Sequence, residues 1–422
     1  MDKMIRTLQE LVSINSVAEP GKDGMPYGPG PTEAIRYILG VCDSFGFRTC
    51  LTENYGYAEI GEGEELIGIL SHLDVVPAGD GWTYDPFGGQ IAGDRIYGRG
   101  TIDDKGPTVA SIYAMKDILE DAQNKGFAVN KRIRIILGQT EENGDWKDME
   151  AYRESEELPT YGFAPDGDFP AIHCEKGVMV IRITMPLAGS GIRSVKCGNA
   201  PNMVPAHAEI ETSDGIFSGE GRPYHGCAPW GGYNAMDDLL GNMRTKSCLT
   251  DTPFFRMYES LFEGKIYGEG IGCEICDEES GMLTVNPGKI TSNDDYIELL
   301  LDIRYPVTAD PQPIINKIKS HAAEYGADAE CIHHMEPVYM DKNGPVMQNL
   351  LEAYRTHTGD CSDPIAIGGG TYARAMPGII AFGPNFPGHE NREHQNDEYI
   401  LIEDFQKLRK IYKDALMNLL AV

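Results

Sequence analysis

The sequence predicts an α/β protein in which helices flank a mostly parallel central sheet and an inserted α+β domain interrupts the chain. Three observations predict this class. Helical patterns alternate with apolar strands in the first part of the chain, strands and helices segregate in the middle, and the alternating pattern returns near the end. We therefore expect one domain built from residues 1–176 and 337–422, and a second domain over residues 177–336.

The first part of the chain alternates helices and strands. Amphipathic spacing predicts helices over Met4–Ile14, Thr32–Phe45 and Thr108–Asn124, and short apolar runs predict buried strands over Leu66–Leu70 and Ile133–Leu137. Ligands of such sheets gather beyond the carboxyl ends of the strands. The residues that follow the two strands are therefore the first candidates for a functional site.

The pattern changes near Gly177, where polar and glycine-rich segments begin to separate the elements. The middle part predicts strands over Gly177–Pro186 and Asp294–Pro306, and helices over Ala235–Met243, Phe254–Phe262 and Pro311–Tyr325. From about Pro337 the first pattern resumes, with a helix over Asn349–Thr358, a strand over Gly378–Phe382 and a closing helix over Asp404–Leu420.

Charge narrows the choice of partners. The 422 residues include 36 basic and 65 acidic side chains, a formal net charge of −29. Such a surface repels nucleic acid and anionic membranes, whereas it suits a protein that acts on small molecules and holds divalent cations. No apolar stretch approaches the ~20 residues of a membrane span. The ten cysteines are scattered and no signal peptide is evident, so we expect reduced thiols and a cytoplasmic location.

The motif SHLD places His72 and Asp74 just beyond the first buried strand. Positions i and i+2 of a strand share a face, so the two side chains can meet if the extended backbone continues. A metal-ligating histidine needs a carboxylate or carbonyl to orient its second ring nitrogen, which is a suitable role for Asp74. The plainer alternative is a buried histidine beside a turn aspartate.

Two further pairs of acids follow in glycine-rich loops. Asp103 and Asp104 stand in GRGTIDDKGP before a helix, where a carboxylate can bridge two metal ions or only cap the helix. Glu141 and Glu142 follow the strand of RIRIILGQTEENGD. Catalysis at a metal centre needs one carboxylate on the metal and another free to move a proton, so this pair can divide those roles, or it can form a solvated acidic loop.

The remaining candidates come later in the chain. GFAPDGDFP supplies Asp166 and Asp168 in a proline-bounded turn, and GHENREHQNDE supplies His389 and His394, either of which could be a ligand. Each motif alone is weak evidence, but together they provide two histidines and several carboxylates beside strand ends. That set suits zinc, manganese or cobalt, and two close ions better than one.

The motifs SHLDVVPAGDGW, YGRGTIDDKGP, GQTEENGDW, GFAPDGDFP and EHQNDE resemble those of the co-catalytic zinc peptidases and deacylases. That family includes aminoacylase, acetylornithine deacetylase, succinyl-diaminopimelate desuccinylase and carboxypeptidase G. The resemblance covers nearly the whole chain and is greatest to the PepV-type dipeptidases. It implies a zinc-peptidase-like catalytic domain, residues 1–176 and 337–422, and an inserted lid domain, residues 177–336.

The resemblance also implies a role for each motif residue. His72 and Asp166 would bind one ion, Glu142 and His394 the other, and Asp103 would bridge the two, with a cis peptide often following the bridging aspartate. Asp74 would orient His72, and Glu141 would be the general base. The implied substrate-binding residues are His225, which would stabilise the oxyanion, Asn202 and Arg304, which would grip a carboxylate, and Gly369, Gly370 and Thr371 of the loop IGGGTYAR.

The implied activity is hydrolysis of dipeptides with a free amino terminus, with two divalent ions as cofactors, zinc before manganese or cobalt. Deacylation of N-acyl amino acids is the first alternative, and a homologue that binds metal or peptide without turnover is the second. The predicted lid spans residues 177–336, which is larger than the minimal lid of this family. This favours a monomer over a homodimer joined through the lid.

Overall fold

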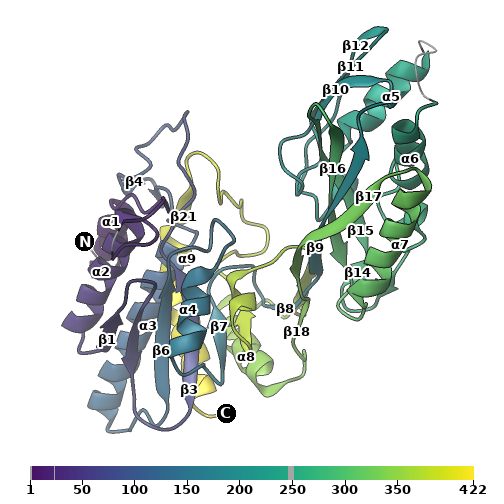
Figure 1. Ribbon diagram of the computed structural model, residues 1–422. Helices are drawn as coiled ribbons and strands as arrows, with labels where there is room; N and C mark the ends of the chain where they lie inside the picture. Colours follow the sequence, from purple (N-terminus) through teal and green to yellow (C-terminus); the bar gives the residue numbers. More distant parts are fainter. Residues whose placement is uncertain (1, 23, 246–250) are drawn as a thin grey trace. The chain divides into compact units, whose positions relative to one another are not determined.

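Figure 1 shows the computed structural model of the protein, which describes residues 2–22, 24–245 and 251–422. The chain forms two compact units. The first contains Met1–His173, Met340–Ile365 and Thr371–Val422, and the second contains Cys174–Tyr339 and Ala366–Gly370. The short glycine-rich segment Ala366–Gly370 thus belongs to the second unit by its contacts, although its place in the sequence put it in the first predicted domain.

The first unit is built on a sheet whose central strands are parallel. The strands that lie wholly in this unit have the order β1-β2-β6-β3-β7-β20, and β3 pairs in parallel with β6 and β7, as β7 does with β20. The outer strands β1 and β2 are antiparallel. The bounds are β1 Arg48–Leu51, β2 Gly56–Ile60, β3 Leu66–His72, β6 Arg132–Gly138, β7 Tyr161–Ala164 and β20 Ile379–Ala381. This arrangement confirms the predicted fold class.

Helices complete the first unit, and α3 packs against both α1 and α9. The helices are α1 Lys3–Val12, α2 Pro29–Ser44, α3 Lys105–Lys125, α4 Lys147–Ser155, α8 Pro345–Thr358 and α9 Ile402–Leu419, with the 3-10 turn η3 Tyr372–Ala375. A small antiparallel sheet contains β4 Gln90–Ala92, β5 Arg95–Tyr97 and β21 Tyr399–Leu401. Within the described residues, no helix is both long enough and apolar enough to cross a membrane.

The second unit contains a seven-stranded antiparallel sheet of order β12-β11-β10-β15-β16-β9-β17. Its strands are β9 Gly177–Pro186, β10 Ile192–Cys197, β11 His207–Thr212, β12 Gly215–Glu220, β15 Thr284–Ser292, β16 Tyr296–Tyr305 and β17 Asp328–Met335. The helical segments are α5 Ala235–Thr245, α6 Pro253–Leu261, α7 Pro311–Glu324, η1 Pro229–Gly231 and η2 Glu269–Ile271. β13 Cys276–Asp277 and β14 Gly281–Met282 pair with each other. The remaining short strands, β8 Ile172–Glu175, β18 Val338–Tyr339 and β19 Ile365–Ile367, lie where the chain passes from one unit to the other.

Local sequence explains why these elements form where they do. Asp2 caps α1 by accepting a hydrogen bond from the Met4 N–H, and Thr252 and Asp310 cap α6 and α7 in the same way. Strand β3 is buried along its whole length, as is typical of a central parallel strand with both faces of its sheet covered, and its residues Leu66–Leu70 contain no polar side chain. The predicted strand ended at Leu70, whereas β3 continues to His72 and so carries that histidine to the edge of the sheet.

The centre of the first sheet is expected to dominate the stability of the first unit. Ile69 is fully buried on β3, where it lies beside Ile135 and Phe163 of the neighbouring strands. Ile69→Ala should lower the free energy of unfolding by about 2–5 kcal/mol, since it leaves a cavity among strands that cannot collapse. Chemical denaturation of the metal-free protein measures this.

The matched control is Leu51→Ala on the edge strand β1, where the side chain is 43% exposed. That change should alter the free energy of unfolding by no more than about 0.5 kcal/mol. Equal effects of the two substitutions would contradict this description of the core.

Candidate metal centre

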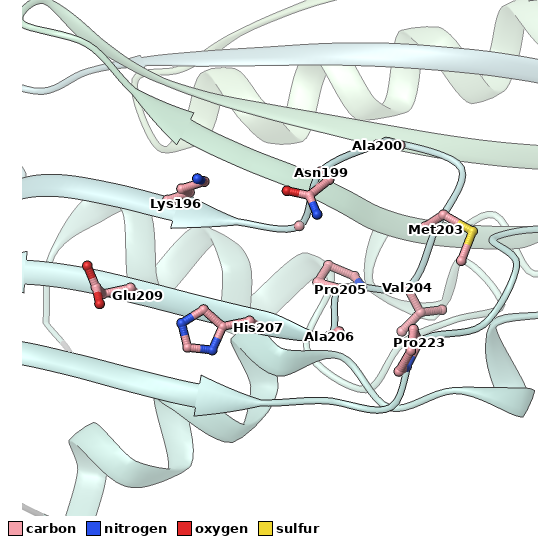
Figure 2. Close-up of a pocket in the computed structure, with 11 residues that line it drawn as sticks. Lys196, Asn199, Ala200, Met203, Val204, Pro205, Ala206, His207, Glu209 and Pro223 are labelled. Atoms are coloured by element: carbon pink, nitrogen blue, oxygen red, sulfur yellow. The ribbon is translucent and has the colours of Figure 1, made fainter. Parts of the chain in front are cut away.

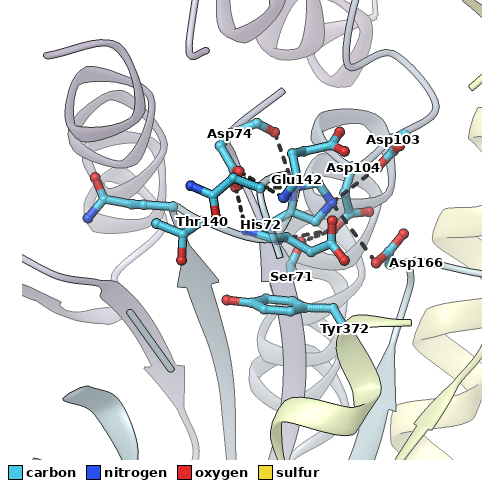
Figure 3. Close-up of polar contacts among 12 residues, drawn as sticks. Ser71, His72, Asp74, Asp103, Asp104, Thr140, Glu142, Asp166 and Tyr372 are labelled. Atoms are coloured by element: carbon cyan, nitrogen blue, oxygen red, sulfur yellow. Dashed lines mark hydrogen bonds and ion pairs between the residues drawn. The ribbon is translucent and has the colours of Figure 1, made fainter. Parts of the chain in front are cut away.

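The candidate residues gather at one edge of the first sheet. His72 ends β3, Glu141 and Glu142 follow β6, and Asp166 follows β7. Because these three strands are parallel, their carboxyl ends lie at the same edge. Figure 3 shows the side chains of His72, Glu142 and Asp166 converging there, together with that of Asp103.

Asp103 lies between two imidazoles. Its Oδ1 atom is 3.1 Å from Nε2 of His72, and its Oδ2 atom is 2.9 Å from Nε2 of His394. His394 Nε2 is also 2.9 Å from Oε2 of Glu142, and His72 Nε2 is 4.0 Å from Oδ2 of Asp166. The two oxygens of one carboxylate thus face two histidines, each of which has a further carboxylate beside it.

His72 is oriented by Asp74 through the backbone. The His72 Nδ1–H donates to the Asp74 carbonyl oxygen at 3.1 Å, while the Asp74 carboxylate lies 3.4 Å from the same nitrogen. This hydrogen bond fixes the ring so that Nε2 faces Asp103. The Asp74 carboxylate accepts the backbone N–H groups of Glu141 and Glu142, at 3.3 and 3.0 Å. Asp74 therefore holds both the histidine and the loop that carries the glutamate pair.

Two buried acids that had no assigned role in the candidate site fix the backbone around it. Asp104 follows Asp103 through a cis peptide bond, and its carboxylate hydrogen-bonds the hydroxyl of Ser71. Asp148 accepts the backbone N–H groups of Gln139 and Thr140, at 2.5 and 3.0 Å. Asp104 was considered a helix cap, and nothing in the local sequence distinguished Asp148, because its partners lie on another element.

Tyr372 is a third supporting residue that sequence reasoning missed. Its hydroxyl donates to Asp148 at 3.0 Å, and its ring lies edge-on to that of His72 with centroids 5.9 Å apart. Its backbone N–H hydrogen-bonds Asp166. Thr371, which was predicted to bind substrate, is the buried residue just before it.

The structure also separates candidates that the spacing had left equivalent. His389 pairs with Asp404 at 2.7 Å, whereas His394 faces Asp103 and Glu142. Asp168 hydrogen-bonds the side chain of Asn385, whereas Asp166 lies beside His72.

The predicted substrate-binding residues His225, Asn202, Arg304, Gly369 and Gly370 lie in the second unit. Arg304 is buried and makes a bidentate ion pair with Asp302, at 2.6 and 2.8 Å, and its Nη1 donates to the Gly368 carbonyl at 2.9 Å. The Nδ1 atom of His225 accepts the backbone N–H of Cys227 at 3.2 Å. Burial and the charge of Arg304 lower the pKa of His225, which favours a neutral ring with its proton on Nε2.

Figure 2 shows a cavity of about 520 Å³ in the second unit, beside the loop that contains Asn202. Strands β10 and β11 contribute the polar side chains of Lys196, His207 and Glu209 to its lining. The loop contributes Asn199 and Met203. The Asn202 carbonyl accepts the Gly226 N–H at 2.7 Å, which ties this loop to the segment of His225.

Burial makes the charge of the metal-free site costly. Burial and nearby carboxylates raise the pKa of Glu142 to about 7 and that of Asp166 to about 6. Hydrogen bonds to Asp103 and Glu142 raise the pKa of His394 to about 11. Glu141 is also raised well above its usual pKa, by burial and by the charge of Asp166. Positive charge among these residues would offset the concentration of buried carboxylates.

The donor set fits divalent cations. It combines imidazole nitrogens with carboxylate oxygens, and ligand atoms of His72, Asp103 and Glu142 all lie within 4.8 Å of one another. Among the described residues, the buried Oε1 atom of Glu142 has no hydrogen-bond partner, as expected of an oxygen reserved for a cation. Imidazole and carboxylate ligands suit zinc, manganese or cobalt, and ions bound here would activate water for hydrolysis.

The chain belongs to peptidase family M20/M25/M40, whose family model matches residues 68–418. This confirms the predicted family, and the protein is a hydrolase of that family. A Staphylococcus haemolyticus protein named "Putative dipeptidase" is 35% identical over 459 residues, covering 99% of this chain and 97% of its own. "Putative dipeptidase YtjP" of Bacillus subtilis is 36% identical over 462 residues, with the same coverage of 99% and 97%.

Solved structures of the family share the fold at low sequence identity. The aminoacylhistidine dipeptidase of Vibrio alginolyticus has a TM-score of 0.63 and 14% identity, covering 99% of this chain and 95% of its own. The YXEP protein of Bacillus subtilis, described as a dinuclear metal-binding peptidase, has a TM-score of 0.58 and 14% identity, covering 99% and 97%.

The raised pKa values predict how pH affects the metal-free protein. Asp166 and Glu142 bind protons more tightly in the folded protein than in the unfolded chain. Their contributions to stability are therefore lost as the pH rises through about 6 for Asp166 and about 7 for Glu142. The raised pKa of His394 acts in the same direction at higher pH. The melting temperature of EDTA-treated protein should therefore fall between pH 5 and pH 8.

Added Zn²⁺ should raise the melting temperature more at pH 8 than at pH 5, because metal ions compete with protons for these ligands. Thermal scans with and without the ion measure both effects. A metal-free protein that gains stability over this pH range would contradict the electrostatic description of the site.

Proposed function

We propose that this protein is a dipeptidase that cleaves dipeptides with a free amino terminus and a free carboxylate, using two divalent ions. The observation that carries the proposal is the position of Asp103, whose two oxygens face His72 and His394. His72 and Asp166 would hold one ion, Glu142 and His394 the other, and Asp103 would bridge them. The dipeptidase names of full-length relatives support the substrate class.

Two bound divalent ions would polarise the scissile carbonyl and lower the pKa of a shared water from ~15.7 towards ~7. Glu141 acts as the general base: it accepts a proton from the attacking water and delivers it to the leaving amine. Its backbone N–H donates to the Asp74 carboxylate, which fixes the position of this glutamate beside the candidate ligand Glu142.

The second unit acts as a lid that binds the other parts of the substrate. Arg304 grips the substrate carboxylate with Asn202, and Asp302 preorganises the Arg304 guanidinium. A neutral His225 donates its Nε2–H to the oxyanion, since its Nδ1 already accepts the Cys227 N–H. Gly369, Gly370 and Thr371 border the substrate.

Three finer assignments accompany this proposal. Zinc is the first choice of metal because imidazole and carboxylate ligands suit it, with manganese or cobalt as alternatives. The protein is a monomer, because its lid is larger than the minimal kind. Its location is cytoplasmic, in keeping with the nine described cysteines, which form no disulfide with one another; Cys248 lies outside the described residues.

Glu141→Gln should retain both metal ions and lose about 10²–10⁴-fold in kcat, because the water loses its proton acceptor. Elemental analysis and steady-state kinetics measure the two properties separately. Glu154→Ala, on the exposed surface of α4, is the control and should leave kcat unchanged. Near-normal turnover by Glu141→Gln would remove the general-base assignment.

A substrate panel tests the dipeptidase assignment. Free dipeptides should be cleaved, and the same dipeptides with a C-terminal amide should lose on the order of 10²-fold in kcat/KM. The loss follows from the charge-assisted hydrogen bonds to Arg304, each worth about 1.5–3 kcal/mol. Faster cleavage of N-acetyl or N-succinyl amino acids would establish a deacylase instead. Two bound ions per chain without cleavage of any amide would indicate an inactive homologue.

A further inference from the structure

A buried ion pair joins the segment before Asp103 to the segment after His394. Nη1 of Arg99 is 2.5 Å from Oε2 of Glu398, and the two side chains are 2% and 1% exposed. The other carboxylate oxygen of Glu398 accepts the backbone N–H of Ile102 at 3.0 Å. Glu398 therefore contacts both the arginine and the residue that immediately precedes Asp103.

The backbone reinforces this connection. The Gly98 N–H donates to the Glu398 carbonyl at 2.9 Å. Residues 98–102 are thus held to residue 398 by three contacts, although almost 300 residues separate them in the chain. The segments joined in this way lead directly to Asp103 and from His394, whose side chains lie 2.9 Å apart.

The two candidate ligands depend on this connection to different extents. Asp103 has a second anchor, because the adjacent Asp104 carboxylate bonds to Ser71 on β3. His394 has a side chain that is 54% exposed and a backbone with φ of 59°, a conformation that a non-glycine residue adopts only when its surroundings hold it. Loss of the buried pair should therefore displace His394 more than Asp103.

Other contacts also hold the His394 loop. Asp397 accepts the backbone N–H groups of Thr83 and Tyr84, at 2.8 and 3.3 Å, and the Asn396 side chain donates to the Asp80 carbonyl at 2.7 Å. These contacts hold the loop to residues 80–84, which include no candidate ligand. Glu393 also accepts a hydrogen bond from the Asn385 side chain at 2.6 Å, and the Asn385 N–H donates to the Gly167 carbonyl, next to Asp166. Glu398 is the side chain that joins this loop to Ile102, next to Asp103, and the pairing of β21 with β5 joins the residues that follow Glu398 to residues 95–97.

We propose that Arg99 and Glu398 are positioning residues that set the distance between Asp103 and His394, and thereby the affinity for the ion assigned to Glu142 and His394. The affinity for the ion assigned to His72 and Asp166 should not depend on them. This inference rests on the proposed two-ion site and adds a residue pair that touches neither ion. Residues that orient metal ligands from outside typically change metal affinity 10–100-fold when they are substituted.

Glu398→Gln tests the inference, because the amide has nearly the same shape and can still accept the Ile102 N–H, but has no charge for Arg99. The test is made in two backgrounds that each retain one ion. In Asp166→Ala protein, adding Glu398→Gln should weaken Zn²⁺ binding about 10–100-fold. In Glu142→Ala protein, the same addition should change Zn²⁺ affinity less than about twofold. Calorimetric titration of metal-free protein measures all four affinities.

A second variant guards against unfolding, since Glu398→Gln leaves a buried arginine without its counter-charge. Replacing both members, as Arg99→Met with Glu398→Leu, removes the charges together, a change that buried ion pairs often tolerate. The double replacement should weaken binding of the same ion, the one assigned to Glu142 and His394. The control is Asp117→Asn, which breaks the Arg409–Asp117 pair between α9 and α3, at 2.6 Å, away from the candidate ligands. It should leave both affinities unchanged.

The outcomes separate this inference from the proposed function. Wild-type protein that binds fewer than two ions overturns both. If wild-type protein binds two ions but the variants leave both affinities unchanged, or lower both equally, the positioning role alone is overturned. Zn²⁺ affinity that falls only in the Asp166→Ala background, with unchanged affinities in the Asp117→Asn control, establishes the positioning role.

Discussion

The Asp103 carboxylate, placed between His72 and His394, is the interaction on which the rest of the site depends. Each of its oxygens lies within about 3 Å of a different imidazole nitrogen. The carboxylates of Glu142 and Asp166 lie beside these imidazoles, and burial raises the pKa values of both. Such a concentration of negative charge is costly inside a protein unless cations offset it. The chain belongs to a peptidase family, which connects this concentration of charge with hydrolysis.

Holding that carboxylate in place requires a second group of buried acids with a different task. Asp74, Asp104, Asp148 and Glu398 each accept hydrogen bonds from the backbone or side chains of another segment. Their contacts tie the ligand-bearing loops to β3, to β6 and to one another. One set of carboxylates therefore faces the candidate metal centre, while the other set fixes the backbone around it. This division explains why so many acids are buried close together in one unit.

The second unit shows the same use of charge to orient Arg304, the proposed carboxylate-binding residue. Asp302 holds Arg304 with two short contacts, and the guanidinium also contacts the Gly368 carbonyl, so it is oriented before any ligand arrives. Preorganisation of this kind reduces the entropy lost on binding. The glycine-rich segment that contains Gly368 connects this arginine to the chain that continues into Thr371 and Tyr372 of the first unit.

The sequence by itself determined the alternation of helices and strands, the inserted domain, and the types of side chain that follow each buried strand. These features depend on local periodicity and on residue chemistry, which are legible along the chain. Spacing alone left His389 equivalent to His394 and Asp168 equivalent to Asp166, and only the family resemblance distinguished them. The tertiary structure decided which of each pair faces Asp103 or His72, and it revealed Asp104, Asp148 and Glu398. The reason is physical: a ligand's direction is set by contacts such as Arg99–Glu398, whose partners lie 299 residues apart and leave no local pattern.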